Sequence, residues 1–380
     1  MKLLHTSDWH LGRTLHGASL IEHQRGFLSW LVELAVRERV DAVLVAGDVY
    51  DRAVPPTDAV RLLDESLAAF AAARVPVVLT SGNHDSAIRL GFGRALGRSA
   101  GIHLCTDLSA LTAPVLLTDD AGEVAVYGIP YLLPDAVMDD LGAERSHTGV
   151  LSAAVERIRS DAAQRGVGRV VALAHAFVTG ARGCESERDI RVGGIGDAPA
   201  SVFEGLTYTA LGHLHGAQRV GDRVHYSGSP LAFSFSEAAH TKSVSLVEID
   251  AAGEVRVDRV PAPVPRALRE VRGRLDELLA LDAPDLADAW VKAVLTDARR
   301  PMAPMELLRE RWPHTLVLDF QPEGTRADPA ADLARLREST DPVEVCAAFM
   351  EWVDSTRPDR AHEDTLRSAV EAVRRLEASA

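Results

Sequence analysis

His5-Thr6-Ser7-Asp8-Trp9-His10-Leu11-Gly12 follows directly on the apolar pair Leu3-Leu4, and this stretch decides the fold. Four more polar clusters come where an apolar, strand-like run ends: Gly47-Asp48, Gly82-Asn83-His84-Asp85, Ala174-His175 and Gly212-His213-Leu214-His215. An α/β scaffold places reactive side chains at the carboxyl ends of its strands. The sequence therefore predicts an α/β fold in which these clusters form one site.

The pattern of apolar runs supports this fold as far as about residue 260. Strand-like runs alternate there with amphipathic helical ones, as in βαβ units. The expected strands end at Ser7 or span 42–46, 75–80, 123–129 and 169–174, and the expected helices span 20–37, 57–73 and 150–165. After Thr207 come consecutive strands, expected at 207–211, 223–226, 243–249 and 254–260. These indicate a second, more antiparallel sheet.

The three prolines of Pro261-Ala262-Pro263-Val264-Pro265 remove backbone donors and stiffen the chain, which indicates a domain boundary. Beyond it the pattern predicts a small α+β domain, with strands at 267–271, 290–295 and 315–320 and helices at 275–281 and 305–311. A polar linker with Pro322, Gly324 and Pro329 follows. We expect domains at 1–262 and 266–322, a linker at 323–341 and a helical hairpin at 342–380.

The hairpin consists of two amphipathic helices separated by Arg357-Pro358-Asp359. Each helix carries an apolar stripe at three- and four-residue spacing. The stripes are Val345, Phe349 and Trp352 in one helix and Leu366, Val370, Val373 and Leu376 in the other. They suit either packing on this chain's own core or docking on a partner's coiled coil.

Composition excludes several classes of protein. The 380 residues are 47% hydrophobic and 25% charged, and no apolar run reaches the roughly 18 residues of a membrane helix. The start Met1-Lys2-Leu3-Leu4 lacks a secretory signal, so we expect a cytoplasmic protein. Cys105, Cys184 and Cys346 are too scattered for a disulfide framework or a zinc site. The net charge of −14 argues against tight DNA binding by this chain alone.

The clustered residue types indicate a pair of metal ions. Asp8 and His10 lie two residues apart, as do His213 and His215, so each pair can direct two ligands to one ion. Asp48 has two carboxylate oxygens and can bridge two ions. Asn83 offers a neutral oxygen and His175 another imidazole. Mixed oxygen and nitrogen ligands without a thiolate favour manganese, iron or magnesium over structural zinc. Two metals so placed can hydrolyse a phosphodiester.

The order of these motifs resembles that of the calcineurin-like metallophosphoesterases. The likeness is closest to the bacterial SbcD family of nuclease subunits. It is carried by the first motif together with 46–51, 82–86, 211–218 and 226–230, whereas after Pro261 only the order of domains is similar. The resemblance implies two β-sheets packed face to face and flanked by helices. It also implies that the small domain caps the DNA-binding face.

The same resemblance implies two Mn²⁺ ions, with Mg²⁺ or Fe²⁺ as alternatives. The implied activities are 3′ to 5′ exonuclease and endonuclease cleavage of double-stranded DNA ends and hairpins, in DNA repair, recombination and replication. The implied partner is an SMC-like ATPase, SbcC, bound by a homodimer of this subunit within a nucleoid-associated heterotetramer. Apolar residues near 15–21 and 54–60 are candidates for the self-interface.

Carried over position by position, the resemblance assigns a role to each motif residue. Asp8, His10, Asp48 and His215 would hold the first metal, and Asp48, Asn83, His175 and His213 the second. Ala174 precedes His175 where the family often has glycine, which makes His175 the least typical ligand. His84 would bind no metal and would donate a proton to the leaving 3′ oxygen or stabilise the transition state. Asp85 either orients the His84 ring or caps the helix after Ser86.

Other polar residues have simpler interpretations. We expect His5 to make structural hydrogen bonds. Arg13 and His16 lie in a loop that either contacts DNA phosphate or is only exposed. Arg182, Arg188 and Arg191 lie in a Gly-rich charged segment that either orders against DNA or the partner or, as we expect, is a solvated loop. Two other functions use the same residues: a stand-alone phosphomonoesterase or cyclic-nucleotide phosphodiesterase, and a scaffold that only binds its partner. The extra domains argue against the first, and the intact ligand set argues against the second.

Overall fold

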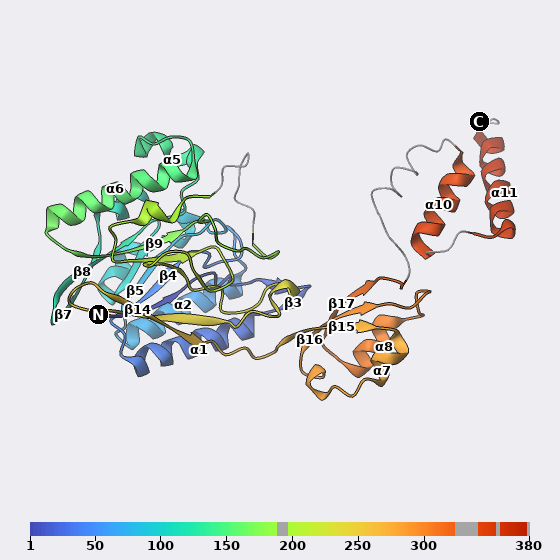
Figure 1. Cartoon of the computed structure of the whole chain (residues 1–380), viewed down its shortest axis with the longest axis horizontal. Coiled ribbons are helices and arrows are strands. Elements are labelled where there is room, and N and C mark those ends of the chain that lie inside the picture. The colour runs from blue at the N-terminus through green and yellow to red at the C-terminus, as the bar shows by residue number, and fades with distance from the viewer. Residues whose placement is uncertain (188–196, 324–340, 355–357, 378–380) are drawn as a thin grey trace. The chain divides into compact units, whose positions relative to one another are not determined.

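The computed structural model describes residues 1–187, 197–323, 341–354 and 358–377 (Figure 1). The chain divides into two compact units, Met1–Pro265 and Arg266–Ala380, and each is described by itself.

The first unit begins with a six-stranded sheet in the order β14-β13-β1-β4-β5-β6. Its strands are β1 (Lys2–Thr6), β4 (Ala42–Ala46), β5 (Val77–Thr80), β6 (Ile102–Cys105), β13 (Ser243–Ile249) and β14 (Val255–Pro261). The first four run parallel, and β13 pairs antiparallel with both β1 and β14. Parallel strands covered on both faces are apolar throughout, and all five residues of β4 are buried.

The second sheet also has six strands, in the order β11-β12-β10-β9-β8-β7. These strands are β7 (Val115–Asp119), β8 (Gly122–Gly128), β9 (Arg169–His175), β10 (Tyr208–Gly212), β11 (Gln218–Arg219) and β12 (Val224–Tyr226). The middle four are parallel and only the edge strands β7 and β11 pair antiparallel.

The expected antiparallel sheet after Thr207 is wrong. The strands were placed correctly along the chain, but they divide between two sheets. β10 and β12 extend the parallel row next to β9, whereas β13 and β14 cross to the other sheet and pair beside β1. Hydrophobic periodicity identifies a strand but carries no information about its distant partner.

The two sheets pack face to face and helices cover their outer faces, so the expected sandwich is confirmed (Figure 1). Successive side chains of β4 point to opposite faces of the sheet and so pack into two different clusters. Val43 and Val45 pack with the helices α1 (Ile21–Glu38) and α2 (Thr57–Ala72), and Leu44 packs towards the second sheet. On the far side α5 (Pro134–Leu141) and α6 (His147–Arg165) cover the second sheet.

The remaining short elements of this unit were mostly not predicted. They are β2 (Thr14–Leu15), β3 (Ala18–Ser19), α3 (Ala87–Leu90), α4 (Arg94–Gly97) and the 3-10 turns η1 (Arg98–Ala100), η2 (Leu108–Thr112), η3 (Ala200–Phe203) and η4 (Phe235–Glu237). Elements of two to five residues show too few periods for a pattern to emerge.

The second unit contains a parallel three-stranded sheet, β15 (Leu268–Gly273), β16 (Trp290–Leu295) and β17 (Thr315–Phe320). The helices α7 (Leu275–Ala280) and α8 (Pro304–Arg311) pack on it around buried Leu278, Leu308 and Trp312, and η5 (Pro284–Leu286) connects α7 to β16. The expected strands and helices of this region are therefore present.

The same unit ends with α10 (Pro342–Asp354) and α11 (Arg360–Glu377), which contact each other. Gly324 and Pro329 of the expected linker, Arg357 of the expected turn and the side chains of Trp352 and Leu376 lie outside the described residues. Over the part of the chain that the structure covers, no helix combines the length and apolarity that crossing a bilayer would need.

Candidate metal centre

The predicted ligands lie at the carboxyl ends of the central strands of both sheets. Asp8 and His10 follow β1, Asp48 follows β4 and Asn83 follows β5 in the first sheet. In the second sheet His175 ends β9, and His213 and His215 follow β10. Because these parallel strands end at the same edge of two facing sheets, the structure brings all seven predicted ligands together.

Asp48 occupies the centre of this cluster. Its Oδ2 lies 3.4 Å from His175 Nε2, 3.6 Å from His10 Nε2 and 3.8 Å from His84 Nε2. The side chains of Asp48, His10 and His175 are all at most 3% exposed. Asp48 therefore faces both halves of the site, as a bridging carboxylate must.

One half of the site is formed by Asp8, His10 and His215, whose ligand atoms lie within 4.8 Å of one another. His10 Nε2 is only 3.2 Å from His215 Nε2. Ser7 Oγ donates to Asp8 Oδ2 at 2.5 Å, and the backbone N–H of His213 donates to both Asp8 oxygens. The Asp8 carboxylate is therefore fixed in direction before any ion binds.

The other half of the site is formed around Asn83, whose Oδ1 lies 2.9 Å from His175 Nε2 and 3.2 Å from His213 Nδ1. His175 Nδ1 donates to the backbone oxygen of Ala46 at 3.0 Å, since a carbonyl can only accept. That bond fixes the ring so that Nε2 faces Asp48 and Asn83. The alanine before His175 does not displace the ring from the site.

The pKa values of the four predicted ligand histidines shift in two directions. Burial lowers the pKa of His10 well below its usual value, and burial with nearby His175 lowers that of His213 to about 3. Both rings are therefore neutral at pH 7, the form that ligates a metal. Burial opposes charge on His175, yet the Asp48 carboxylate raises the His175 pKa to about 9. Burial opposes charge on His215 as well, yet its contacts with Cys184 and Glu237 raise the His215 pKa to about 9. His175 and His215 must therefore each lose a proton before they can bind a metal ion.

The donor set passes the test for a pair of divalent ions. The seven side chains supply only nitrogen and oxygen, they are largely buried, and they converge on one carboxylate. In the His10 ring, Nε2 is the nitrogen that faces Asp48 and His215, and Nδ1 lies 3.7 Å from Asp51 Oδ1. The donor set therefore suits a divalent cation that prefers mixed oxygen and nitrogen ligands.

A comparison with known families decides what kind of protein this is. Residues 1–217 match the family profile described as calcineurin-like phosphoesterase. This chain belongs to the calcineurin-like phosphoesterases. Residues 264–353 of the phosphoesterase match a second profile, described as type 5 capsule protein repressor C-terminal domain.

A relative of known name shows which group within this family the phosphoesterase resembles. The phosphoesterase is 36% identical over 372 residues to the SbcD subunit of the SbcCD nuclease from Rhodobacter capsulatus, an alignment that covers 88% of this chain and 92% of the relative. It is therefore a homologue of the SbcD nuclease subunits, as expected from the sequence.

Two solved structures are similar at a lower level. TT1561 of Thermus thermophilus has a TM-score of 0.40 and 14% identity over 68% of this chain and 98% of that one. The calcineurin-like phosphoesterase YfkN from Bacillus subtilis has a TM-score of 0.36 and 14% identity over 69% of this chain and 89% of that one.

His84 lies beside the ligand cluster of the phosphoesterase. Its backbone N–H donates to Asp48 Oδ1 at 2.9 Å, and its ring Nδ1 donates to the backbone oxygen of Asp51 at 2.7 Å. The ring centroid is 4.6 Å from that of His10. With Nδ1 held by Asp51, Nε2 is the ring atom directed towards Asp48.

Asp85 serves neither of the purposes considered from the sequence. Its carboxylate accepts from the backbone N–H groups of Val49, Tyr50 and Gly82 at 2.9 to 3.1 Å. The cap of α3 is Ser86 instead, and the Nδ1 atom of His84 is held by Asp51. Asp85 thus ties the loop after β4 to the loop after β5, which fixes the relative positions of Asp48 and His84.

The segment after β9 is not the solvated loop expected from its charge. Ser186 Oγ lies 2.7 Å from His215 Nδ1, and Glu187 Oε1 accepts from the His215 backbone N–H at 2.6 Å. Arg182 is exposed, but its backbone exchanges two hydrogen bonds with the Gln218 side chain. Arg188 and Arg191 lie outside the described residues.

The structure also tests what the sequence predicted for His5, Arg13 and His16. His5 is a structural residue, with ring contacts to Tyr208 Oη at 2.9 Å and Leu211 O at 3.1 Å. Arg13 is not merely exposed, because its guanidinium lies 4.9 Å from the centre of the Phe233 ring and donates to Ser186 O. His16 stacks near Phe235 at 5.5 Å between centroids. Sequence reasoning missed the Phe233 contact, for which no local spacing gives a signal.

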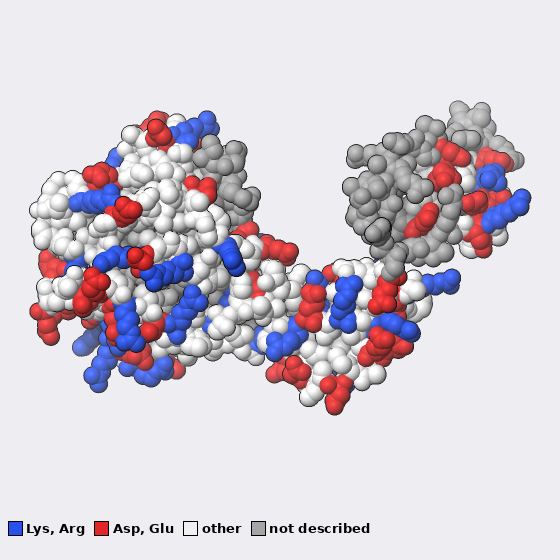
Figure 2. Space-filling model, in the orientation of Figure 1, with Lys and Arg blue, Asp and Glu red and all other residues white. Residues whose placement is uncertain are grey.

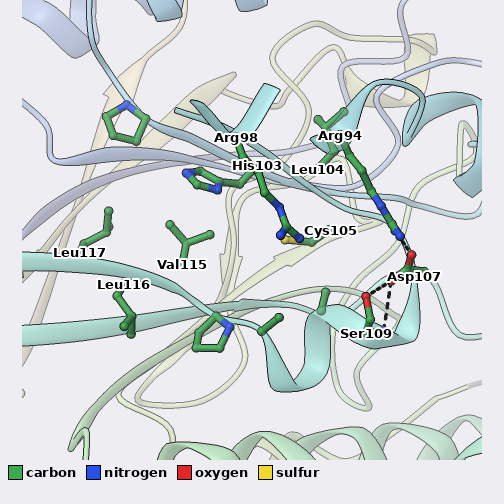
Figure 3. Close-up of a pocket in the computed structure, with 14 residues that line it drawn as sticks. Arg94, Arg98, His103, Leu104, Cys105, Asp107, Ser109, Val115, Leu116 and Leu117 are labelled. Carbon is green, nitrogen blue, oxygen red and sulfur yellow. Dashed lines mark hydrogen bonds and ion pairs between the residues drawn. The ribbon is translucent and has the colours of Figure 1, made fainter. Parts of the chain in front are cut away.

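A separate cavity of about 480 Å³ opens between the edge strands β6 and β7 (Figure 3). Its walls include Arg94, Arg98, His103 and Cys105, with Arg94 paired to Asp107. None of the predicted ligands lines this cavity. On the face shown in Figure 2, basic and acidic side chains are intermixed over both units.

Proposed function

We propose that the chain is a manganese-dependent DNA nuclease subunit that hydrolyses phosphodiester bonds as a 3′ to 5′ exonuclease and as an endonuclease, including at hairpins. The observation that supports this best is the gathering of six oxygen and nitrogen side chains around Asp48, the seventh proposed ligand, with the His84 ring beside them. The nuclease name of the relative from Rhodobacter capsulatus points to the same activity.

The ligand residues divide into two sets around Asp48. Asp8, His10, Asp48 and His215 would hold one cation, and Asp48, Asn83, His175 and His213 the other. Two bound cations would supply charge neutralisation at the phosphate and an activated water. Mn²⁺ suits this mixture of carboxylate, amide and imidazole ligands, and Mg²⁺ and Fe²⁺ are the alternatives.

His84 is the proposed catalytic acid. Its Nδ1–H is held by the Asp51 carbonyl, so the proton available for transfer is the one on Nε2 of the imidazolium. Nε2 lies 3.8 Å from Asp48 Oδ2, so a phosphate bound at the proposed metal centre would lie beside it. After the transfer the ring is neutral and keeps its bond to Asp51, so it need not move during the step.

The separate units suggest how the subunit is assembled. We place the nuclease domain at 1–262, the DNA-capping domain at 266–322 and the ATPase-binding hairpin at 342–380. In the hairpin, Phe349 and Val373 are each 53% exposed although both belong to apolar stripes. An SMC-like ATPase coiled coil would cover them. A chain ending at residue 341 should fail to co-purify with the ATPase, and retained binding would disprove this placement.

Self-association is proposed through a different surface from the first one considered. Leu15 and Leu20 are buried at 1% and 2% exposure, so these two apolar residues of the region 15–21 are not available to a second copy. Ile88, Phe92 and Leu96, in contrast, are 88%, 88% and 82% exposed. Arg89 donates to the Ala53 carbonyl oxygen, so α3 lies beside the loop of Val54, which is 64% exposed. We call this surface the α3 patch and propose that a second copy covers it.

The acidic chain needs help to hold DNA. The net charge of −14 and the intermixed charges of Figure 2 suit a subunit that borrows DNA affinity from its ATPase partner. Work on DNA ends would place the complex with the nucleoid in the cytoplasm.

The activity is tested by comparing three substrates with purified protein and Mn²⁺. A nuclease should cleave a DNA hairpin and bis-nitrophenyl phosphate, a diester, and should leave nitrophenyl phosphate, a monoester, largely intact. Preference for the monoester would replace this proposal with a stand-alone phosphomonoesterase. No hydrolysis of any substrate, repeated with the ATPase present, would indicate a scaffold.

A further inference from the structure

Residues 180–187, which we call the strap, contact the proposed ligand His215. This segment leaves β9 and returns to the metal centre without belonging to any helix or strand. Its Ser186 and Glu187 both contact His215, one through the ring and one through the backbone. The strap therefore contacts His215 at Nδ1 and at the backbone N–H, whereas Nε2 faces His10.

The hydrogen bonds of Ser186 have only one consistent direction. Ser186 Oγ lies 2.6 Å from Glu237 Oε1, and an ionised carboxylate can only accept, so the hydroxyl proton points to Glu237. The Ser186 oxygen must then accept at 2.7 Å from His215 Nδ1–H. His215 Nδ1 therefore carries a proton, and Nε2 is the ring nitrogen that faces His10 Nε2, 3.2 Å away.

The Glu237 carboxylate, which accepts the Ser186 hydrogen bond, is itself held in place by other contacts. It is 1% exposed and accepts from the Phe233 backbone N–H at 2.9 Å. Buried Lys242, 4% exposed, pairs with the Glu237 carboxylate and also donates to the His215 backbone oxygen at 3.0 Å and to Ser229 Oγ at 2.9 Å. A buried ion pair with all its bonds satisfied has little freedom to move.

The strap is itself held at both ends. Arg13 donates to the Ser186 backbone oxygen at 2.8 Å, and the same guanidinium lies over Phe233 and 3.5 Å from Asp51 Oδ1. At the other end the backbone of Arg182 bonds to the Gln218 side chain. Ser186 is therefore placed by contacts that do not themselves involve the metal ligands.

We propose that Ser186 is a positioning residue for His215, and that docking of the strap determines how tightly the cation held by Asp8, His10, Asp48 and His215 binds. Ser186 fixes both the tautomer and the direction of the His215 ring, through a serine placed between histidine and carboxylate. Outer partners of metal ligands commonly change metal affinity by about 10- to 100-fold. This inference rests on the proposed two-metal function.

Ser186→Ala removes the acceptor of the His215 ring and tests the proposal. The probe is Mn²⁺ alone, titrated into the full chain by calorimetry, with electron paramagnetic resonance to separate coupled pairs from single ions. The affinity for one of two ions should fall about 10- to 100-fold, the other should stay within about twofold, and the coupled-pair signal should be lost at two equivalents. Loss of the two Ser186 hydrogen bonds should lower the melting temperature without metal, and circular dichroism should show that the variant is still folded at the temperature of the titration.

Two further variants separate positioning from general damage. Ser186→Thr keeps the hydroxyl and should restore both affinities. Thr179→Ala is the matched control, because it removes a hydroxyl just before the strap whose bond, 2.9 Å long, goes to Asp197 and not to His215. It should bind both ions normally.

The possible results separate failure of the positioning role of Ser186 from failure of the proposed two-metal function. Wild-type protein that binds fewer than two ions would overturn the proposed function. Wild-type protein that binds two ions, with Ser186→Ala binding them equally well or losing both alike, would overturn the positioning role alone. The same selective loss in Thr179→Ala would also overturn it.

Discussion

Asp8, His10, Asp48 and His213 each adopt a positive φ, at 54°, 45°, 49° and 105°. Residues with a Cβ avoid this region, at a cost of about 1 to 3 kcal/mol each, and such residues gather at functional sites. The fold tolerates this strain because the loops are held by bonds such as those from the backbone N–H groups of Asp8 and His10 to the oxygens of Gly47 and Asp48. Ligand geometry is thus set before an ion arrives.

Replacing the proposed acid separates chemistry from metal binding. His84→Ala should lower kcat on DNA by about 10²- to 10⁴-fold, because the leaving oxygen loses its proton donor. Bound metal, counted by elemental analysis, should stay at the wild-type number since His84 is outside both ligand sets. Full activity in this variant would exclude His84 as the acid.

We expect Asp85 to contribute to the stability of the fold and not to take part in the reaction directly. Asp85→Ala leaves the N–H groups of Val49, Tyr50 and Gly82 without their acceptor, which should lower the free energy of unfolding by about 3 kcal/mol. Denaturant unfolding measures this. Asp58→Ala, at a side chain 72% exposed, is the control and should change stability by at most about 0.5 kcal/mol. Equal effects of the two variants would contradict the role given to Asp85.

Residues close together in sequence were predictable and distant ones were not. All seven residues of the cluster could be named from the sequence because pairs such as Asp8 and His10 place two donors within one motif. Ser186, Glu237 and Lys242 were missed because each meets His215 only through the fold. The contact of His84 was also invisible, since the Asp51 carbonyl is a backbone group that any residue would supply.

At the scale of elements, the site depends on how closely two strands of different sheets approach. A Cβ on Gly212, at the end of β10, would lie 1.8 Å from the backbone oxygen of Ala46, at the end of β4. The strand ends can therefore meet only through glycine. This close approach is what brings His213 and Asp48 into one cluster.

Gly212→Ala should force these strand ends apart. We expect it to destabilise the protein by about 3 kcal/mol or more and to reduce bound metal, as followed by thermal unfolding with and without Mn²⁺. Gly168→Ala is the matched control, because nothing lies within 4 Å of its Cβ position, and it should change stability by less than about 1 kcal/mol. A stable, metal-binding Gly212→Ala variant would mean that the sheets can separate without loss of the site.

The sequence predicted the positions of the long helices and strands better than it predicted which strands pair with each other. The helix expected at 20–37 is α1, Ile21–Glu38, because Phe27, Leu31 and Leu34 form a clear buried face. The strands after Thr207 were located but assigned to one sheet instead of two. Partner choice depends on packing between distant segments, which a local period does not encode.

At the scale of the whole molecule, the α3 patch predicts association. Phe92→Asp places a charge at the centre of the proposed contact and should convert a dimer to a monomer, as measured by sedimentation velocity. Met302→Asp, at a side chain 89% exposed in the second unit, is the control and should leave the mass unchanged. A wild-type protein that is monomeric at all concentrations, alone and with its ATPase partner, would refute the interface.

The central claim is that seven residues around Asp48 hold two cations that cleave DNA. The most direct test is cleavage of an end-labelled DNA hairpin by the wild-type protein, first with chelator and then with Mn²⁺ returned, alongside Asp48→Asn. We predict cutting that stops with chelator, returns with Mn²⁺ and is absent in Asp48→Asn, because the bridging ligand is lost. Cutting that survives chelation, or that persists in Asp48→Asn, would contradict this account.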